Sequence, residues 1–167
     1  MKLIAAVDEN WGIGRGNNLL ISIPRDMKFF REKTKDSVVV MGRKTLESFP
    51  GGNPLKNRVN IVLTSNRDYH KGDAVIVNDI KGILAEVDKY KEKDVYVIGG
   101  GQIYKMLLPY CDTAYITKIY HSIEADTFFP DLDLDSEWEI TDESEIYDHE
   151  GMSFAFITYK RIKNVQR

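Results

Sequence analysis

Three short apolar runs constrain the fold of this chain more than any other feature. Residues 3–7, 38–41 and 95–98 read Leu-Ile-Ala-Ala-Val, Val-Val-Val-Met and Val-Tyr-Val-Ile, without alternation of polar and apolar positions. Runs of this length that end at polar residues or glycine are typical of strands buried on both faces. We therefore expect a sheet whose two faces are both covered by helices.

Helical patterns lie between these runs. One helix is predicted to begin at Pro24, a favoured first-turn residue, and another to follow a cap at Asn78 or Asp79. A third carries apolar residues from Ile103 onward and is ended by Pro109. Strands that alternate with crossover helices form parallel sheets between two layers of helices, which predicts a three-layer α/β fold.

The C-terminal third follows a different pattern. Residues 115–120, 138–147 and 153–160 are predicted strands, and the last two are joined around Glu150-Gly151 without a helix. This predicts an antiparallel C-terminal edge on a mixed, mostly parallel sheet. Lys160-Arg161 and the tail to Arg167 are expected to be a solvated end. Because no linker or repeat interrupts the 167 residues, we expect residues 1–167 to form a single domain.

Charge and cysteine content exclude several classes of protein. Lys and Arg number 23 against 26 Asp and Glu, a net charge of -3 that offers no basic face for nucleic acid. The single cysteine, Cys111, excludes an internal disulfide framework and fits a reducing compartment. No apolar run is long enough for a signal peptide or a membrane helix. We expect a cytoplasmic protein with no nucleic-acid or membrane partner.

Two predicted strands run directly into glycine and then into a helix. The junctions are Met41-Gly42-Arg43-Lys44-Thr45 and Ile98-Gly99-Gly100-Gly101-Gln102-Ile103-Tyr104. In a parallel sheet the ligand crevice lies at the carboxyl ends of the strands, where glycines let the backbone approach a phosphate. Together the junctions favour a site for the two phosphates of a dinucleotide. The alternative is that the glycines only make tight turns.

Basic and hydroxyl side chains lie close to these junctions. Arg43-Lys44 belongs to the first, and Thr64-Ser65-Asn66-Arg67 follows the predicted strand at 58–63. Such a cluster suits the ribose 2′-phosphate of NADP, whereas NAD is usually held there by a carboxylate. The alternative is a solvated basic patch.

Other motifs do not support a site. Gly42-Arg43-Lys44-Thr45 resembles the end of a P-loop, but valines occupy the place of its flexible loop. Asp131, Asp133 and Asp135 copy the first ligands of an EF-hand, but Ser136 replaces the glycine that its turn needs. The three histidines lack ligand spacing and complete no catalytic triad. We predict no metal site.

Asp26 is the most informative carboxylate. At about 100° per residue it lies about 40° from Phe30 and about 60° from Ile23, at the border of the helix's apolar face. An acid in an apolar wall has its charged form disfavoured unless a cationic or hydrogen-bonding ligand meets it. The alternative is a first-turn Asp stabilised by the helix dipole.

Taken in order, these motifs resemble bacterial-type dihydrofolate reductases over essentially the whole chain. The matching segments are Leu3-Ile4-Ala5-Ala6, Ile13-Gly14, Ile23-Pro24-Arg25-Asp26 with Phe29-Phe30, Met41-Gly42-Arg43-Lys44-Thr45-Leu46-Glu47-Ser48, Pro54-Leu55-Lys56-Asn57-Arg58, Ile98-Gly99-Gly100-Gly101-Gln102-Ile103-Tyr104, Thr117 and Asp126-Thr127-Phe128-Phe129-Pro130. The resemblance implies a fold of eight mostly parallel strands and about four flanking helices, and we expect a monomer. It also implies NADPH-dependent reduction of 7,8-dihydrofolate to tetrahydrofolate.

The resemblance further assigns roles to residues. Asp26 would accept hydrogen bonds from pterin N3 and the 2-amino group while hydride passes to C6 and water protonates N5. Arg58 would hold the α-carboxylate of the glutamate tail, and Thr117 would hydrogen-bond to Asp26. The residues implied to bind dihydrofolate are Ile4, Ala5, Asp26, Phe30, Phe49, Leu55, Arg58, Ile98 and Thr117. The residues implied to bind NADPH are Ala6, Ile13, Gly14, Asn17, Leu19, Gly42, Arg43, Lys44, Thr45, Leu63, Thr64, Ser65, Gly99, Gly100, Gly101, Gln102, Ile103 and Tyr104.

One segment departs from the family's pattern. Leu19-Leu20-Ile21 stands where relatives usually carry Leu-Pro-Trp, whose tryptophan helps to hold a water near the pterin and packs the mobile active-site loop. Ile21 has no N–H to donate, so altered kinetics are expected for the same reaction. Three alternatives stay open: a reductase of this fold that acts on a pyrimidine or ribosyl-pyrimidine, a nucleotide-binding module without chemistry and, third, a phosphotransferase.

Overall fold

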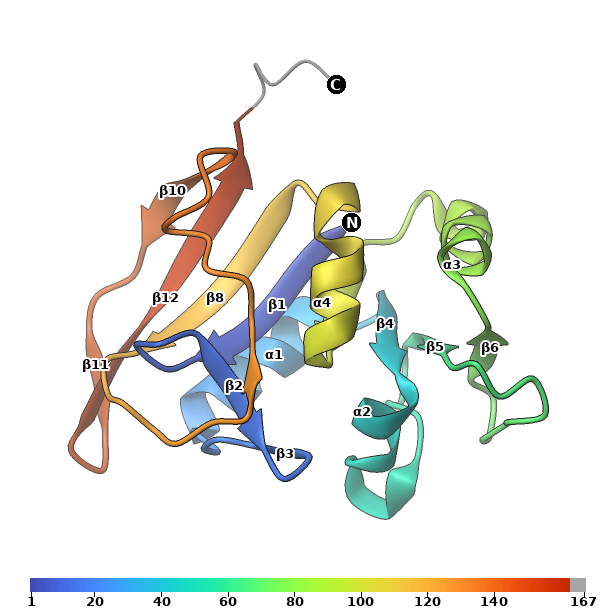
Figure 1. The fold of residues 1–167 in the computed structure, drawn as a ribbon, viewed down its shortest axis with the longest axis horizontal. Helices are drawn as coiled ribbons and strands as arrows, with labels where there is room; N and C mark the ends of the chain where they lie inside the picture. The colour runs from blue at the N-terminus through green and yellow to red at the C-terminus, as the bar shows by residue number, and fades with distance from the viewer. Residues whose placement is uncertain (163–167) are drawn as a thin grey trace.

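Eight strands in one continuous order, with a ninth paired at the side, form the main sheet of the protein (Figure 1), which the computed structural model describes over residues 1–162. The strands lie in the order β10-β12-β8-β1-β7-β4-β5-β6. Their bounds are β1 (Lys2–Val7), β4 (Val38–Gly42), β5 (Val59–Leu63), β6 (Val75–Val77), β7 (Val95–Gly99), β8 (Thr113–Ile119), β10 (Trp138–Glu143) and β12 (Met152–Arg161). The predicted tail to Arg167 lies partly outside the described residues.

The pairing confirms the mixed sheet. The strands from β8 through β1, β7, β4 and β5 to β6 pair in parallel, whereas β12 is antiparallel to both β8 and β10. Val38, Val39, Val40 and Met41 of β4 are each 0% exposed, as expected for a strand covered on both faces.

In the described part of the chain, four α-helices cover the two faces: α1 (Pro24–Thr34), α2 (Arg43–Glu47), α3 (Ile80–Val87) and α4 (Gly101–Leu107). One core cluster packs Ile83 of α3 and Leu107 of α4 against one face of the sheet. A second packs Leu46 of α2 and Phe30 of α1 against the other. In Figure 1, α4 accordingly lies in front of the sheet and α1 behind it, which confirms the three layers.

Local signals explain where these helices begin and end. Pro24 takes the first position of α1, where its missing N–H is not needed. The Asp79 side chain caps α3 by accepting a hydrogen bond from the Gly82 N–H at 2.7 Å. Asn78 instead donates to the carbonyl of Thr64, so Asp79 is the cap of the two candidates. The helix α4 ends at Leu107, and Pro109 follows in a short 3-10 turn. Within residues 1–162, no helix is long and apolar enough to cross a membrane.

A second, smaller sheet lies at the carboxyl end of β1. Its strands β2 (Gly12–Arg15), β3 (Asn18–Leu19) and β9 (Thr127–Phe128) lie in the order β3-β2-β9. The segment between β1 and α1 thus folds as a hairpin whose first strand pairs with β9, more than a hundred residues later in the chain. We call residues 8–23 the β1–α1 loop.

The predicted strand at 138–147 is wrong, because two strands occupy that region. The pairing of β10 with β12 shifts register between Ile140 and Asp142, and β10 ends at Glu143. A separate strand, β11 (Tyr147–His149), then pairs with β12. The turn between β11 and β12 is the predicted Glu150-Gly151, with φ of 49° and 82°, the positive pair that a tight two-residue hairpin needs.

The prediction of a solvated end is wrong for Arg161. Its guanidinium donates to the carbonyls of Leu108 at 2.7 Å and Cys111 at 2.9 Å and pairs with Glu137 at 3.0 Å. Arg161 therefore ties the end of β12 to the turn after α4, whereas Lys160 is exposed as predicted.

Candidate active site

Asp26 occupies the first turn of α1, half-buried against the sheet. The Thr117 hydroxyl of β8 donates a hydrogen bond to its Oδ1 at 2.5 Å, and Thr117 itself is 1% exposed. Burial raises the pKa of Asp26 above its ordinary value, and the hydrogen bond from Thr117 opposes this rise only in part. The structure thus contains the hydrogen bond implied by the resemblance and a carboxylate that is poorly solvated.

An apolar wall adjoins this carboxylate. Five of the residues implied to bind dihydrofolate belong to one cluster, and they come from five different segments of the chain. They are Ile4, Phe30, Phe49, Leu55 and Ile98. Ala5 does not join this cluster. Because side chains alternate along β1, Ala5 faces the other side of the sheet and packs against the cluster that contains Ile83 and Leu107.

Tyr104 of α4 contacts β1 from the opposite face of the sheet. Its hydroxyl donates to the carbonyl of Ile4 at 2.7 Å, and the side chain is 4% exposed. Burial, reinforced by the charge of Asp26, raises the pKa of the Tyr104 phenol above its usual range. Tyr104 therefore stays protonated and holds β1 in place.

Arg58 precedes β5 and carries an unsatisfied donor. Its Nε is buried without a hydrogen-bond partner among the described residues, which is costly for a polar atom. Burial lowers the pKa of Arg58, the positive charge of Arg31 lowers it further, and Asp36 opposes both. Two guanidinium groups close enough to repel, one with a free donor, form a site suited to a carboxylate.

The two glycine junctions lie side by side. Met41 of β4 pairs with Gly99 of β7, so both strands end at the same edge of the sheet. A Cβ built at Gly99 would lie 3.2 Å from the Thr45 hydroxyl oxygen, and φ there is +138°. One at Gly42 would lie 3.2 Å from Ile103 Cγ1. The glycines let α2 and α4 approach each other more closely than residues with side chains allow.

The β1–α1 loop lies against the second junction. A Cβ at Gly101 would be 2.7 Å from Thr127 Cγ2 of β9 and 4.0 Å from Ile13 Cδ1 of β2. The Asp126 carboxylate also accepts a hydrogen bond from the Gly16 N–H at 2.9 Å. Ile13 therefore lies beside Gly101, and both residues belong to the set implied to bind NADPH. Asn17 and Leu19 lie at the exposed loop tip, beyond this contact.

The basic and hydroxyl residues gather at the ends of β4 and β5. Gly42 pairs with Leu63, which places Arg43, Lys44 and Thr45 beside Thr64 and Ser65. The Arg43 guanidinium is 3.0 Å from Glu47, while Lys44 and Ser65 are exposed. Backbone free of side chains, two cations and three hydroxyls match the chemistry of a phosphorylated dinucleotide.

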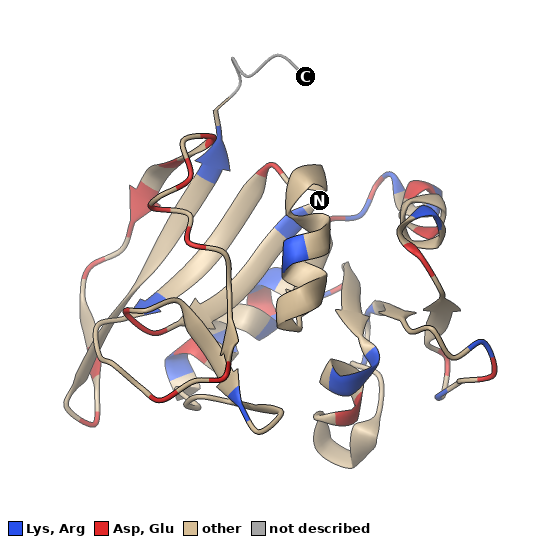
Figure 2. Ribbon diagram, in the orientation of Figure 1, with Lys and Arg blue, Asp and Glu red and all other residues tan. Residues whose placement is uncertain are grey.

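Acidic residues, red in Figure 2, are spread along the C-terminal third of the chain. Among residues 1–162, no group of His, Cys, Asp or Glu is arranged to hold a metal ion. Asp131 instead accepts backbone hydrogen bonds from Asp133 and Leu134, and Asp135 accepts one from Glu137. These aspartates stabilise turns.

Two contributors were missed by sequence reasoning. Arg31 follows Phe30 on α1, and only its approach to Arg58 in three dimensions reveals it. Asp8 is fully buried and accepts hydrogen bonds from the N–H groups of Asn10, Gly12 and Ile123 at 2.8 to 2.9 Å. A carboxylate directly after a buried strand was the available signal for Asp8.

Comparisons with known proteins agree with this geometry. A family model described as Dihydrofolate reductase matches residues 1–161. The dihydrofolate reductase of Bacillus subtilis is 38% identical over 161 residues, covering 92% of this chain and 93% of that protein. That of Staphylococcus haemolyticus is 35% identical and covers 98% and 96%. The dihydrofolate reductase from Enterococcus faecalis, solved in complex with NADP(H) and RAB-propyl, superposes with a TM-score of 0.85 at 40% identity, covering 96% and 95%.

The three-layer fold, together with the similarity to a reductase structure solved with NADP(H), places the chain among the α/β oxidoreductases. Within that class the assignment is specific, since the match extends over nearly the whole chain. The chain belongs to the dihydrofolate reductase family.

Proposed function

We propose that this protein reduces 7,8-dihydrofolate to 5,6,7,8-tetrahydrofolate with NADPH, adding hydride at C6 and a proton at N5 of the pterin. The observation that carries the proposal is Asp26, whose carboxylate is half-buried beside an apolar wall and bound to Thr117. A charge in such a place is costly unless a ligand donates hydrogen bonds to it.

The pterin end of dihydrofolate supplies such donors, and its glutamate end supplies an acceptor for Arg58. Pterin N3–H and the 2-amino group donate to the two oxygens of Asp26, while Phe30, Phe49 and Ile98 provide apolar surface for the rings. The unsatisfied Nε of Arg58 supports binding of the α-carboxylate of the glutamate tail. Arg31 adds a second positive charge on that side.

The glycine junctions and the cluster around Arg43 fit NADPH. Gly99, Gly100 and Gly101 provide backbone that a pyrophosphate can approach, and Lys44 with Ser65 suits the 2′-phosphate. NADPH supplies the hydride when bound. The residues of this chain orient the two rings and exclude water from the space between them.

The proton comes from water in this proposal. Asp26 raises the proton affinity of N5 by its charge, and the Tyr104 hydroxyl is already committed to the carbonyl of Ile4. Ile21 packs against an apolar cluster that includes Ala6 and Phe156 and has no N–H with which to hold a water. Proton delivery therefore depends on how easily water reaches N5 along the β1–α1 loop.

The test is an absorbance assay. Purified protein with NADPH and dihydrofolate is expected to lose absorbance at the reduced-nicotinamide band, with a far lower rate for Asp26→Asn. NADPH oxidation without dependence on dihydrofolate would reject the proposal. Turnover of a ribosyl-pyrimidine in preference to dihydrofolate would favour the alternative reductase, and NADPH binding without turnover would favour a binding module.

A further inference from the structure

The base of the β1–α1 loop contains an unusual tryptophan. Trp11 is only 5% exposed, and its φ of 63° lies in the left-handed region that bulky residues rarely adopt. The backbone N–H of Trp11 donates to the carbonyl of Asp8 at 3.0 Å, and its backbone carbonyl accepts from the backbone N–H of Phe129 at 2.8 Å. A conformation of this kind persists where the surroundings fix it.

Three side chains hold the Trp11 ring. Phe129 stacks on it with centroids 6.0 Å apart and an interplanar angle of 25°, and Tyr159 meets it edge-on at 5.9 Å. The Lys118 ammonium lies 4.9 Å from the ring centroid, within range of a cation–π interaction.

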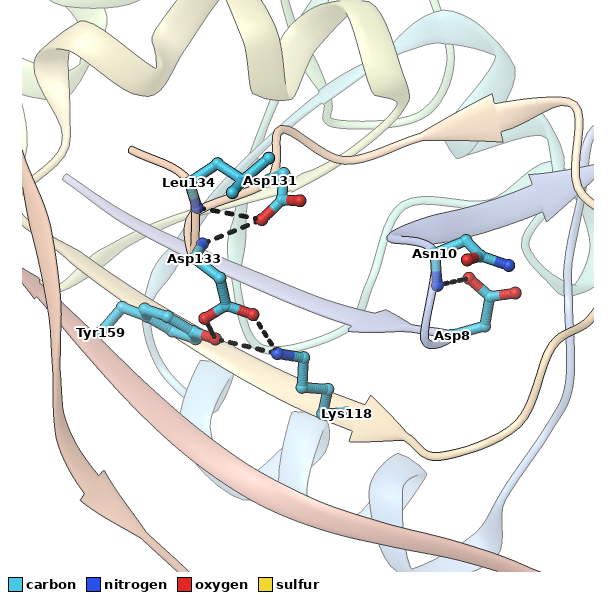
Figure 3. Close-up of polar contacts among 7 residues, drawn as sticks. All are labelled: Asp8, Asn10, Lys118, Asp131, Asp133, Leu134 and Tyr159. Carbon is cyan, nitrogen blue, oxygen red and sulfur yellow. Dashed lines mark hydrogen bonds and ion pairs between the residues drawn. The ribbon is translucent and has the colours of Figure 1, made fainter. Parts of the chain in front are cut away.

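Lys118 is itself fixed by a polar network (Figure 3). Its ammonium forms an ion pair with Asp133 and donates to the Tyr159 hydroxyl at 3.4 Å, and Tyr159 donates to Asp133 at 2.7 Å. Burial acts to raise the pKa of Asp133, but hydrogen bonds from Lys118 and Tyr159 and the charge of Lys118 lower it overall. With its side chain 16% exposed, Lys118 is held over the ring by these contacts.

The residue after Trp11 has no room for a side chain. A Cβ at Gly12 would lie 2.7 Å from Ala125 Cβ and 3.1 Å from Asp8 Oδ1. Gly12 begins β2, which leads to Ile13 against Gly101. Because Trp11 directly precedes β2, a fixed Trp11 ring limits where β2 can lie over the glycine junction.

We propose that Trp11 and Lys118 are positioning residues, which hold residues 12–19 of the β1–α1 loop against the nicotinamide half of NADPH. The inference rests on the proposed function. It gives Lys118 a part complementary to that of its neighbour Thr117, which bonds to Asp26 from the opposite face of β8. One strand then orients the Asp26 carboxylate on one face and the cofactor loop on the other.

The test is calorimetric binding of two ligands to Lys118→Met, which keeps a long apolar side chain and removes the charge. NADPH is expected to bind about 2- to 30-fold more weakly, the range of a lost cation–π interaction. Adenosine 2′,5′-bisphosphate, which lacks the nicotinamide half, is expected to bind unchanged. Lys118→Arg is expected to restore NADPH binding.

A second readout follows the loop without cofactor. Arg15 is exposed within β2, so the rate of trypsin cleavage after it reports release of the loop. Cleavage is expected to be faster in Lys118→Met than in the unchanged protein. The matched control is Lys160→Met, which removes an exposed lysine of β12 and is expected to alter neither readout. If Lys118→Met does not fold, Trp11→Phe is used instead, because it weakens the ring's attraction for the cation. The same comparison of NADPH with adenosine 2′,5′-bisphosphate binding then applies.

Each result separates the possibilities. Equal weakening of both ligands, unchanged NADPH binding and cleavage, or the same changes in Lys160→Met would each overturn the positioning role. Absence of NADPH binding and of dihydrofolate turnover in the unchanged protein would overturn the proposed function instead.

Discussion

Replacing Thr117 with valine tests how the carboxylate is held. Valine keeps the branched shape that fits β8, where Thr117 is 1% exposed, and deletes only the hydroxyl that donates to Asp26 at 2.5 Å. A hydrogen bond to a charged group contributes roughly 1.5–3 kcal/mol, so kcat/KM for dihydrofolate is expected to fall about 10- to 100-fold. Because this hydrogen bond lowers the pKa of Asp26, its loss leaves burial unopposed, and that pKa is expected to rise further.

The assay is kcat/KM as a function of pH. Thr117→Val is expected to move the acid-side transition of the profile to higher pH, because Asp26 then ionises later. Thr113→Val is the matched control, since Thr113 lies on the same strand and its hydroxyl donates to its neighbour Asp112 rather than to Asp26. Combined with Asp26→Asn, Thr117→Val should cost much less than it does alone. If Thr117→Val and Thr113→Val behave alike, the proposed support of Asp26 is refuted.

Three further predictions concern stability and binding. Asp26→Asn is expected to be more stable than the unchanged protein at pH 7, because a raised folded-state pKa means that ionisation destabilises the native state. In urea unfolding this difference should shrink as pH falls toward 3.8, the ordinary value for Asp. Gly101→Ala, whose Cβ would lie 2.7 Å from Thr127 Cγ2, is expected to lower the free energy of unfolding by about 1–3 kcal/mol and to weaken NADPH binding in calorimetry. Arg58→Gln is expected to raise the KM for dihydrofolate about 10- to 100-fold while sparing a dihydropterin without the glutamate tail; equal losses for both would refute the role of Arg58.

The sequence was most informative where local chemistry decides the structure. The buried strands could be predicted because apolar runs such as 38–41 leave no solvent-facing side, and Pro24 and Pro109 marked helix ends by their own geometry. The Asp79 cap was one of two candidates, and only the contact with Gly82 decides between them.

The features that the sequence did not predict depend on contacts between distant segments of the chain. The pairing of β2 with β9 brings residues 12–14 beside 127–128, and neither short strand has a pattern of its own. Arg161 was predicted to be solvated because its hydrogen bonds to the carbonyls of Leu108 and Cys111, about 50 residues earlier, leave no sign in the sequence. In the candidate site, Asp26 could be proposed from its helical position, but the approach of Arg31 to Arg58 and of Lys118 to Trp11 required three dimensions.

The central claim is that Asp26 binds the amino-pyrimidine edge of a pterin, and paired ligands test it most directly. The measurement is the dissociation constant at pH 7 of a 2-amino-4-oxopteridine and of the same ring without the 2-amino group, for the unchanged protein and for Asp26→Asn. The account predicts that Asp26→Asn weakens binding of the amino compound about 10- to 100-fold and of its partner several-fold less. Equal losses for the two rings, or no loss for either, would contradict it.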